Sequence, residues 1–189
     1  MTVLLVRHAT PVRPGTPEYG DDDRPLTPQG LEDAKKLAAI HASTSIDAIY
    51  SSPYFRAFQT VEPVAIRLGL KIEVINDLRE RLLMPAALPD HEWRPHLERS
   101  WRDFGYAPIG GETGRIAQDR VVRVLEHLRS RHPAGIVMVG SHGNLIALAL
   151  NAIDSRLGMD FWAAMPMPAV YRLESSGAGW HIMSGPNVR

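Results

Sequence analysis

Short apolar runs alternate along this chain with stretches in which apolar residues recur every three or four positions. The short runs are rich in β-branched residues and leucine, which is typical of buried strands; they lie at 2–6, 46–50, 71–75 and 135–140. The periodic stretches have the spacing of amphipathic helices; they lie at 28–38, 53–69, 112–131 and 144–152. Strands that alternate with helices predict a three-layer α/β/α sandwich around a mostly parallel central sheet.

Local signals place the ends of these helices. Thr27-Pro28 and Ser52-Pro53 each offer a capping side chain followed by proline at the first helical position. Gly69 is a typical helix end, and Pro63 should kink the helix that ends at Gly69. The apolar stripes predict inward-facing side chains at Leu31, Ala34, Leu37, Ala57, Val61, Val64, Ile116, Val121 and Val124.

Three segments depart from the alternation. Residues 11–28 hold five prolines and several Gly and Asp, which indicates a loop. Residues 81–111 contain two tryptophans and scattered prolines, so we expect an insertion that forms a small cap with one helix around 90–104. Two final strands, at 170–173 and 180–183, should add an antiparallel edge to the sheet. Residues 1–189 are therefore expected to form a single domain.

The composition narrows the classes of function. The chain has 189 residues, 44% of them apolar and 22% charged, with a formal net charge of zero, so no global field would attract nucleic acid. It has no cysteine, which excludes disulfides, thiolate metal sites and a cysteine nucleophile. No stretch is long and apolar enough to cross a membrane, and we expect a cytoplasmic protein. The oligomeric state stays open, a homodimer included.

Charged and polar residues with chemical potential follow the predicted strands. Arg7 and His8 come directly after the first strand, and Arg56 lies in the first turn of the helix after the second. Glu80 follows the third strand and His142 the fourth. Since ligands bind at the carboxyl ends of parallel strands, these five side chains should share one site.

Such a set suits phosphoryl transfer. Arg7 and Arg56 can each direct two donors at phosphoryl oxygens, and a protonated His142 would add a third cationic donor. His8 would attack phosphorus through an unprotonated ring nitrogen, with its other nitrogen held by an acceptor such as a backbone carbonyl. Glu80 would protonate the departing alkoxide and later activate water. No step requires a metal or a cofactor.

Simpler interpretations stand beside these. Glu80 is flanked by Arg79 and Arg81, so it could belong to a surface ion pair. The acidic run 21–23 could suggest a metal site, but beside Arg24 a solvated acidic turn is the better interpretation. Thr10, in the loop after the nucleophile, is a candidate contact for phosphate.

Six motifs, in order along most of the chain, resemble those of the histidine phosphatase superfamily, also called the phosphoglycerate mutase-like family. They are LLVRHATP at 4–11, LTPQG at 26–30, SSPYFRAFQTVEP at 51–63, LRER at 78–81, GGET at 110–113 and VGSHGNLI at 139–146. The resemblance implies phosphate binding by Arg7, Arg56 and His142, a phosphohistidine at His8, and Glu80 as proton donor. The chain departs from the family pattern at Ala9, where glycine is more usual, and in the proline-rich loop that follows.

From these observations we expect a metal-independent phosphatase that acts on a small phosphorylated metabolite through a phosphohistidine intermediate on His8. Three alternatives are a phosphoglycerate mutase-type phosphotransferase, a protein phosphohistidine phosphatase and a non-catalytic phosphate-binding domain. The chain is short for a mutase, the cap insertion disfavours an open site for protein substrates, and loss of catalysis should have removed the nucleophile or an arginine.

Overall fold

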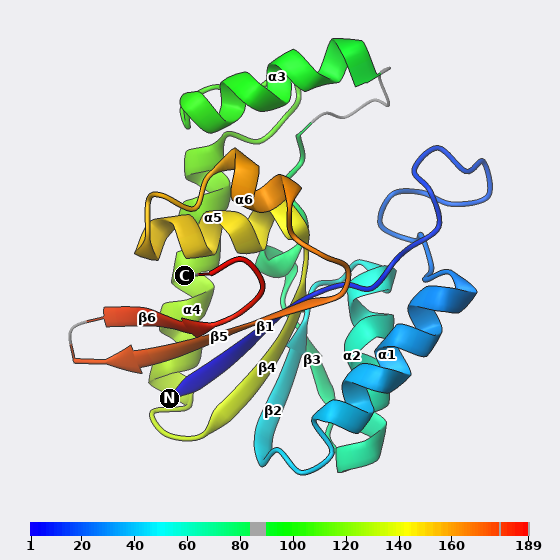
Figure 1. Ribbon diagram of the computed structural model, residues 1–189, viewed down its shortest axis with the longest axis vertical. Coiled ribbons are helices and arrows are strands. Elements are labelled where there is room, and N and C mark those ends of the chain that lie inside the picture. The colour runs from blue at the N-terminus through cyan, green and yellow to red at the C-terminus, as the bar shows by residue number, and fades with distance from the viewer. Residues whose placement is uncertain (84–89, 178, 189) are drawn as a thin grey trace.

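Six strands form one central sheet in the order β3-β2-β4-β1-β5-β6 (Figure 1). This computed structural model describes residues 1–83, 90–177 and 179–188. The strands are β1 (Thr2–Arg7), β2 (Ile46–Ser51), β3 (Ile72–Val74), β4 (Ile136–Ser141), β5 (Ala169–Ser176) and β6 (Gly179–Ser184). The helices are α1 (Pro28–Ile40), α2 (Phe55–Leu68), the short 3-10 helix η1 (Asn76–Leu78), α3 (Asp90–Arg102), α4 (Gly114–Arg131), α5 (Gly143–Ile153) and α6 (Met159–Ala163).

The first four strands run parallel to one another, β5 runs opposite to them, and β6 pairs antiparallel with β5. Strand β1 lies in the middle, paired in parallel with β4 through Val3 and Val137 and antiparallel with β5 through Val3 and Leu173. The antiparallel part therefore has two strands, β5 and β6, which pair with each other. The prediction of a mostly parallel sheet with an antiparallel edge is confirmed.

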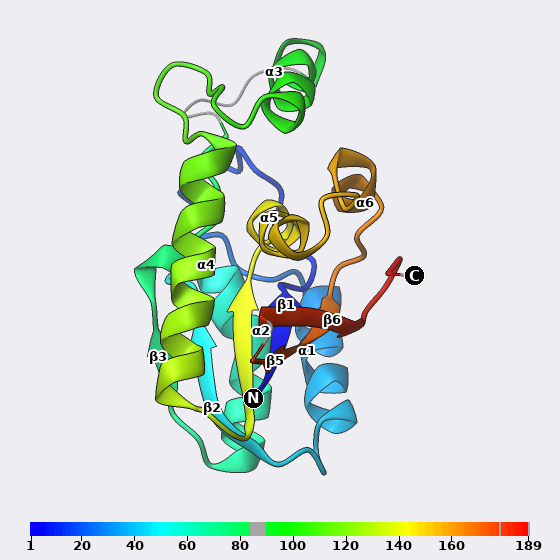
Figure 2. The same ribbon diagram turned by 90° about the vertical axis from the view of Figure 1, so that its left-hand side faces the viewer.

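Alternation of side chains along β1 divides the core into two layers. Val3 and Leu5 pack on the face that is covered by α4, α5 and α6. Leu4 and Val6 pack on the opposite face, against α1 and α2. Figure 2 shows α4 and α1 on opposite sides of the sheet. The predicted three-layer α/β/α sandwich is therefore present.

The helix ends agree only in part with the local signals. Thr27 caps α1 as predicted, because its hydroxyl oxygen accepts from the Gly30 N–H at 3.1 Å. The cap predicted at Ser52-Pro53 is wrong: α2 begins at Phe55, and the Ser52 hydroxyl instead accepts from the Tyr54 N–H at 3.1 Å. Pro63 does not end α2, which continues to Leu68.

Two predicted inward positions are wrong. Leu31 is 40% exposed and Ile116 is 56% exposed. With 100° of rotation per residue, Ile116 lies outside the buried stripe of α4 that contains Ala117 and Val121. Leu31 lies at the margin of the α1 stripe centred on Ala34. The short helix α6 was not predicted.

Helix α3 lies at the end of the molecule toward which the parallel strands run (Figure 2). It matches the helix predicted around 90–104, and Leu97 and Trp101 on it are buried. Residues 84–89 of the proposed cap lie outside the described residues. None of the helices in the described ranges is long and apolar enough to span a membrane.

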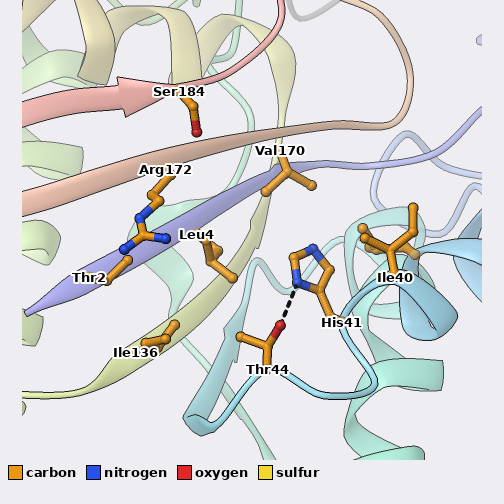
Figure 3. A pocket seen from close by; sticks show the side chains of 10 residues that line it. Thr2, Leu4, Ile40, His41, Thr44, Ile136, Val170, Arg172 and Ser184 are labelled. Atoms are coloured by element: carbon orange, nitrogen blue, oxygen red, sulfur yellow. Dashed lines mark hydrogen bonds between the residues drawn. The ribbon is translucent and has the colours of Figure 1, made fainter.

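A groove of about 430 Å³ lies beside the end of α1 (Figure 3). Leu4, Ile136 and Val170 line its floor, and the His41 ring lies 3.4 Å from the Thr44 hydroxyl at its rim. The guanidinium of Arg172, which also borders the groove, is paired with Glu174 at 2.6 Å. None of the five candidate catalytic residues lines it.

Candidate active site

The register of the central strands brings the two candidate histidines together. Arg7 is the last residue of β1 and pairs with Ser141, the last residue of β4. The His8 N–H donates to the Ser141 carbonyl at 3.0 Å. The ring centroids of His8 and His142 are consequently 5.2 Å apart, in an edge-on arrangement.

His8 is held in one tautomer, with its lone pair on Nε2. Its Nδ1 lies 2.8 Å from the Ala9 carbonyl oxygen, and because a carbonyl only accepts, Nδ1 carries the proton. Its Nε2 accepts from Arg56 Nε at 3.3 Å. Burial, followed by the charge of Arg56, lowers the pKa of His8 to about 3. The ring is therefore neutral and carries its lone pair on Nε2, as a nucleophile requires.

Arg7 ends β1, and Arg56 lies in the first turn of α2. Arg56 is 2% exposed, and besides His8 its guanidinium donates to the Asp21 carbonyl. Nη1 of Arg7 donates to the Met165 carbonyl, whereas its buried Nε has no hydrogen-bond partner among the described residues. Gly143 lies against that Nε: a Cβ at position 143 would be 2.9 Å from it.

His142 is fully buried beside His8. Its Nε2 lies 2.7 Å from the Ser52 hydroxyl, and its Nδ1 has no hydrogen-bond partner within the described parts of the chain. Burial is the main reason that the pKa of His142 lies well below its ordinary value, with the charge of Arg56 next. The ring is thus neutral here, and the cationic form expected from the sequence would need a neighbouring anion to stabilise it.

Glu80 lies at the N-terminus of α5. Its Oε1 accepts from the N–H groups of Arg81 and Leu145 at 2.9 and 3.0 Å, and its Oε2 accepts from that of Asn144 at 3.2 Å. The partial positive charge of a helix N-terminus favours an anion at this place. The flanking guanidinium groups bond elsewhere, that of Arg79 to Asp77 and that of Arg81 to the Glu112 carbonyl. The geometry therefore does not support a surface ion pair as the role of Glu80.

A buried ion pair supports the turn that presents Glu80. Arg120 on α4 is 2% exposed and contacts Glu112 at 2.8 Å. Its Nη1 also donates to the carbonyls of Asp77 and Arg79 at 2.6 and 2.9 Å, on either side of the end of η1. The backbone that leads to Glu80 is thereby held by a buried side chain of α4.

Several residues of the site were not singled out from the sequence. Thr60 accepts from the Ala9 N–H at 3.0 Å and donates to the Arg56 carbonyl at 2.7 Å, which ties the loop after His8 to α2. Ser52 and Thr60 both stand in the 51–63 motif, so the motif contained a signal for them. For Thr10, the phosphate-contact candidate, the structure shows its carbonyl accepting from Thr27.

The acidic run is not simply a solvated turn. Asp21 is paired with Arg24 at 2.6 Å and lies 3.5 Å from Arg56. Arg24, which the sequence analysis treated only as a neighbour of that run, is 7% exposed. Within the described residues, no cluster of three or more His, Asp or Glu could hold a metal ion.

Comparisons with known proteins agree with this fold. The chain is 30% identical over 173 residues to a probable phosphoglycerate mutase of Shigella boydii, covering 87% of this chain and 78% of the relative. A mycobacterial glucosyl-3-phosphoglycerate phosphatase has the same fold, with a TM-score of 0.78, 23% identity and 96% of each chain covered. So does a phosphoserine phosphatase of Entamoeba histolytica, with a TM-score of 0.75, 17% identity and 98% and 96% of the chains covered. These relatives carry the names of phosphatases and mutases, both of which transfer phosphoryl groups. A family model matches residues 3–186, and the chain belongs to the histidine phosphatase superfamily, branch 1.

Proposed function

We propose that this protein is a phosphatase that hydrolyses small phosphomonoesters, with His8 as the transient phosphate acceptor. The observation that carries the proposal is the state of His8: a neutral ring, protonated on Nδ1 by its bond to Ala9, with the Nε2 lone pair directed at Arg56. This tautomer directs the Nε2 lone pair to the side of the ring where a phosphoryl group bound by the Arg56 guanidinium would lie.

In the first step, Nε2 of His8 attacks phosphorus and the ester P–O bond breaks. Arg56 and His142 lie beside the His8 ring, and the charge of Arg7 also acts on it. These three residues would hold the equatorial oxygens, on which charge must be stabilised during transfer. The buried Nε of Arg7 and Nδ1 of His142 would each gain a phosphoryl oxygen as acceptor. In this proposal, Arg7, Arg56 and His142 supply the positive charge that stabilises the phosphoryl oxygens, and no metal or cofactor is needed.

Glu80 is the proposed proton donor. Its Oε1 is fixed by two backbone N–H groups, whereas Oε2 accepts only one, at 3.2 Å, and keeps capacity for a proton. In the first step that proton passes to the departing alkoxide. In the second step Glu80 takes a proton from water, the oxygen of which attacks phosphohistidine, so the P–N bond breaks and inorganic phosphate leaves.

The setting of the reaction is also part of the proposal. We infer a small phosphorylated metabolite as substrate, with the cap segment 81–111 contacting its leaving group. The absence of cysteine from the chain fits a reducing compartment such as the cytoplasm.

The test is turnover of p-nitrophenyl phosphate in the presence of EDTA, with detection of acid-labile, alkali-stable phosphate on His8 by mass spectrometry. We expect turnover and a labelled His8, both lost in His8→Ala, whereas His181→Ala, a change on exposed β6, serves as the matched control. The absence of both turnover and a phosphorylated His8 would contradict the enzyme proposal. Turnover abolished by EDTA would contradict the metal-independent mechanism.

A mutase is the second candidate, favoured by the 30% identity to the probable phosphoglycerate mutase. It is distinguished by ³¹P NMR with 3-phosphoglycerate: a mutase gives the 2-phosphate isomer, and a phosphatase gives inorganic phosphate. Turnover of a phosphohistidine peptide alone would indicate a protein phosphohistidine phosphatase. Phosphate binding without any turnover would indicate a binding domain.

A further inference from the structure

The carboxylate of Asp21 lies between two buried guanidinium groups next to the nucleophile. Its Oδ1 accepts from Arg24 at 3.0 Å from Nε and 2.6 Å from Nη2. Its Oδ2 accepts from Arg56 Nη2 at 3.5 Å. Both arginines are buried, at 7% and 2% exposure, whereas the side chain of Asp21 is 59% exposed. The cations are therefore fixed parts of the protein, and the anion is the exposed partner.

The edge of Arg56 that Asp21 contacts is the one that faces His8. The Nε–H and one Nη2–H of a guanidinium point the same way, and together they form the edge that binds two oxygens of a carboxylate or phosphate. On Arg56 this edge donates to His8 Nε2 through Nε and to Asp21 Oδ2 through Nη2. A phosphoryl group bonded to His8 Nε2 would bring an oxygen to the place that Asp21 Oδ2 holds.

Arg24 presents the same edge to the same carboxylate. Its Nε and Nη2 both donate to Asp21 Oδ1, and its Nη1 is fixed by the Val12 carbonyl at 2.8 Å. The charge of Arg24 also contributes to the low pKa values of His8 and His142, which places it within electrostatic range of both rings. Arg24 and Arg56 thus form an anion clamp, defined by these two residues.

We propose that Arg24 is a further phosphate-binding residue of this site, and that Asp21 is an internal anion that the phosphoryl group of the substrate displaces from the clamp. The proposal deepens the phosphatase function and rests on phosphate binding beside His8. No covalent step is involved: one oxyanion replaces another on the same donors. Phosphate must displace Asp21 before it can bind the clamp. The apparent affinity for phosphate is therefore the intrinsic affinity multiplied by the fraction of molecules in which the clamp is free of Asp21.

The test is the dissociation constant of inorganic phosphate, measured by calorimetry on the full chain. We expect Asp21→Asn to lower this constant by about threefold to tenfold, since exposed carboxylate–arginine pairs contribute modest free energies. The backbone carbonyl of Asp21, which accepts from Arg56, is unchanged by the substitution. Asp22→Asn is the matched control, because it removes the same charge from an exposed neighbouring side chain, and we expect less than about a twofold change.

A second measurement follows the clamp directly. The ¹⁵N–¹H signals of arginine Nε report the hydrogen-bond partner of each guanidinium. Titration of the wild-type protein with phosphate should shift the Arg24 and Arg56 signals together, with the same midpoint.

Equal phosphate affinities in Asp21→Asn and Asp22→Asn would overturn the proposal, as would an Arg24 signal that stays unshifted at saturation. Weaker phosphate binding in Asp21→Asn would also overturn it, and would make Asp21 a residue that positions Arg56. Both measurements are independent of turnover. If phosphate binds as predicted but no ester is hydrolysed, the clamp stands and the phosphatase function fails.

Discussion

The side chain of Arg7 fits only because residue 143 lacks one. A Cβ at this position would lie 2.9 Å from Nε and 3.0 Å from Cζ of Arg7, closer than packed atoms approach. Gly143→Ala should therefore displace a phosphate-binding guanidinium, and we expect kcat/KM for p-nitrophenyl phosphate to fall about 10²-fold.

The control is Gly177→Ala, because a Cβ there would meet nothing within 4 Å. Steady-state kinetics of the two variants, with circular dichroism to verify folding, provide the measurement. Unchanged kinetics in Gly143→Ala would show that Arg7 does not need its present position.

The neutral histidines should make stability depend on pH. The pKa of His8 is about 3 in the folded chain, against an ordinary value of 6.5, so between these values the unfolded chain binds a proton that the folded chain does not. Stability must therefore fall as the pH decreases through this window, by at most about 1.4 kcal/mol per pH unit for each such histidine. His142 is shifted in the same direction.

Urea unfolding between pH 7 and pH 4 measures this slope. We expect His8→Gln to make the slope shallower, whatever its effect on stability at pH 7, and His181→Gln to leave the slope unchanged. A slope that is equal in the wild-type protein and His8→Gln would show that His8 does not carry the expected linkage.

For single residues, the sequence could predict the position of those site side chains that directly follow a strand. Arg7, His8 and His142 could be placed together because parallel strands share one carboxyl edge. Arg24 could not, because its role depends on which side chain approaches it in three dimensions, and a guanidinium offers no local signal of its partner.

At the scale of elements, α4 supports the turn that presents Glu80. The guanidinium of Arg120 binds Glu112 and two carbonyls around η1, just before Glu80. Arg120→Met would remove the 2.8 Å partner of the largely buried Glu112 carboxylate and leave it only Arg79 at 3.9 Å, and we expect a loss of about 3–5 kcal/mol in the free energy of unfolding. The turnover number should fall too, since Glu80 loses the anchor of its turn.

Chemical denaturation and steady-state kinetics measure the two effects. Arg123→Met, an exposed change on the same helix, should alter stability by no more than about 0.5 kcal/mol. Equal stability of the two variants would contradict the role given to Arg120.

The elements themselves show what periodicity can and cannot predict. The pair Thr27-Pro28 predicted the start of helix α1, and the Thr27 cap is present. Helix α2 begins later than Ser52-Pro53 suggests, because the Ser52 hydroxyl is used by His142 and Tyr54. A local capping signal was thus overridden by a tertiary contact.

At the scale of the whole molecule, the strand that carries the nucleophile lies inside the sheet. Strand β1 is bonded along its length to β4 and β5, whereas β3 and β6 each have one neighbour. We expect the amides of Val3 to Val6 to exchange with solvent only through global unfolding, and those of the two edge strands at least about tenfold faster.

Hydrogen exchange followed by mass spectrometry tests this order of protection. Exchange in β1 as fast as in β6 would mean that the sheet opens locally at the site. The alternation of strands and helices predicted a parallel sheet, but the order of its strands was beyond the sequence, because pairing partners are chosen by packing between distant segments.

The position of β1 also makes the fold mechanically asymmetric. A force applied at the first residues must pull β1 out from between two partners, breaking the hydrogen bonds on both of its sides. A force applied beyond Ser184 meets β6 first, and can peel it from β5 one pair at a time. An unfolding machine that drew in this fold from the side of Thr2 would therefore meet its strongest resistance at the strand that leads to His8.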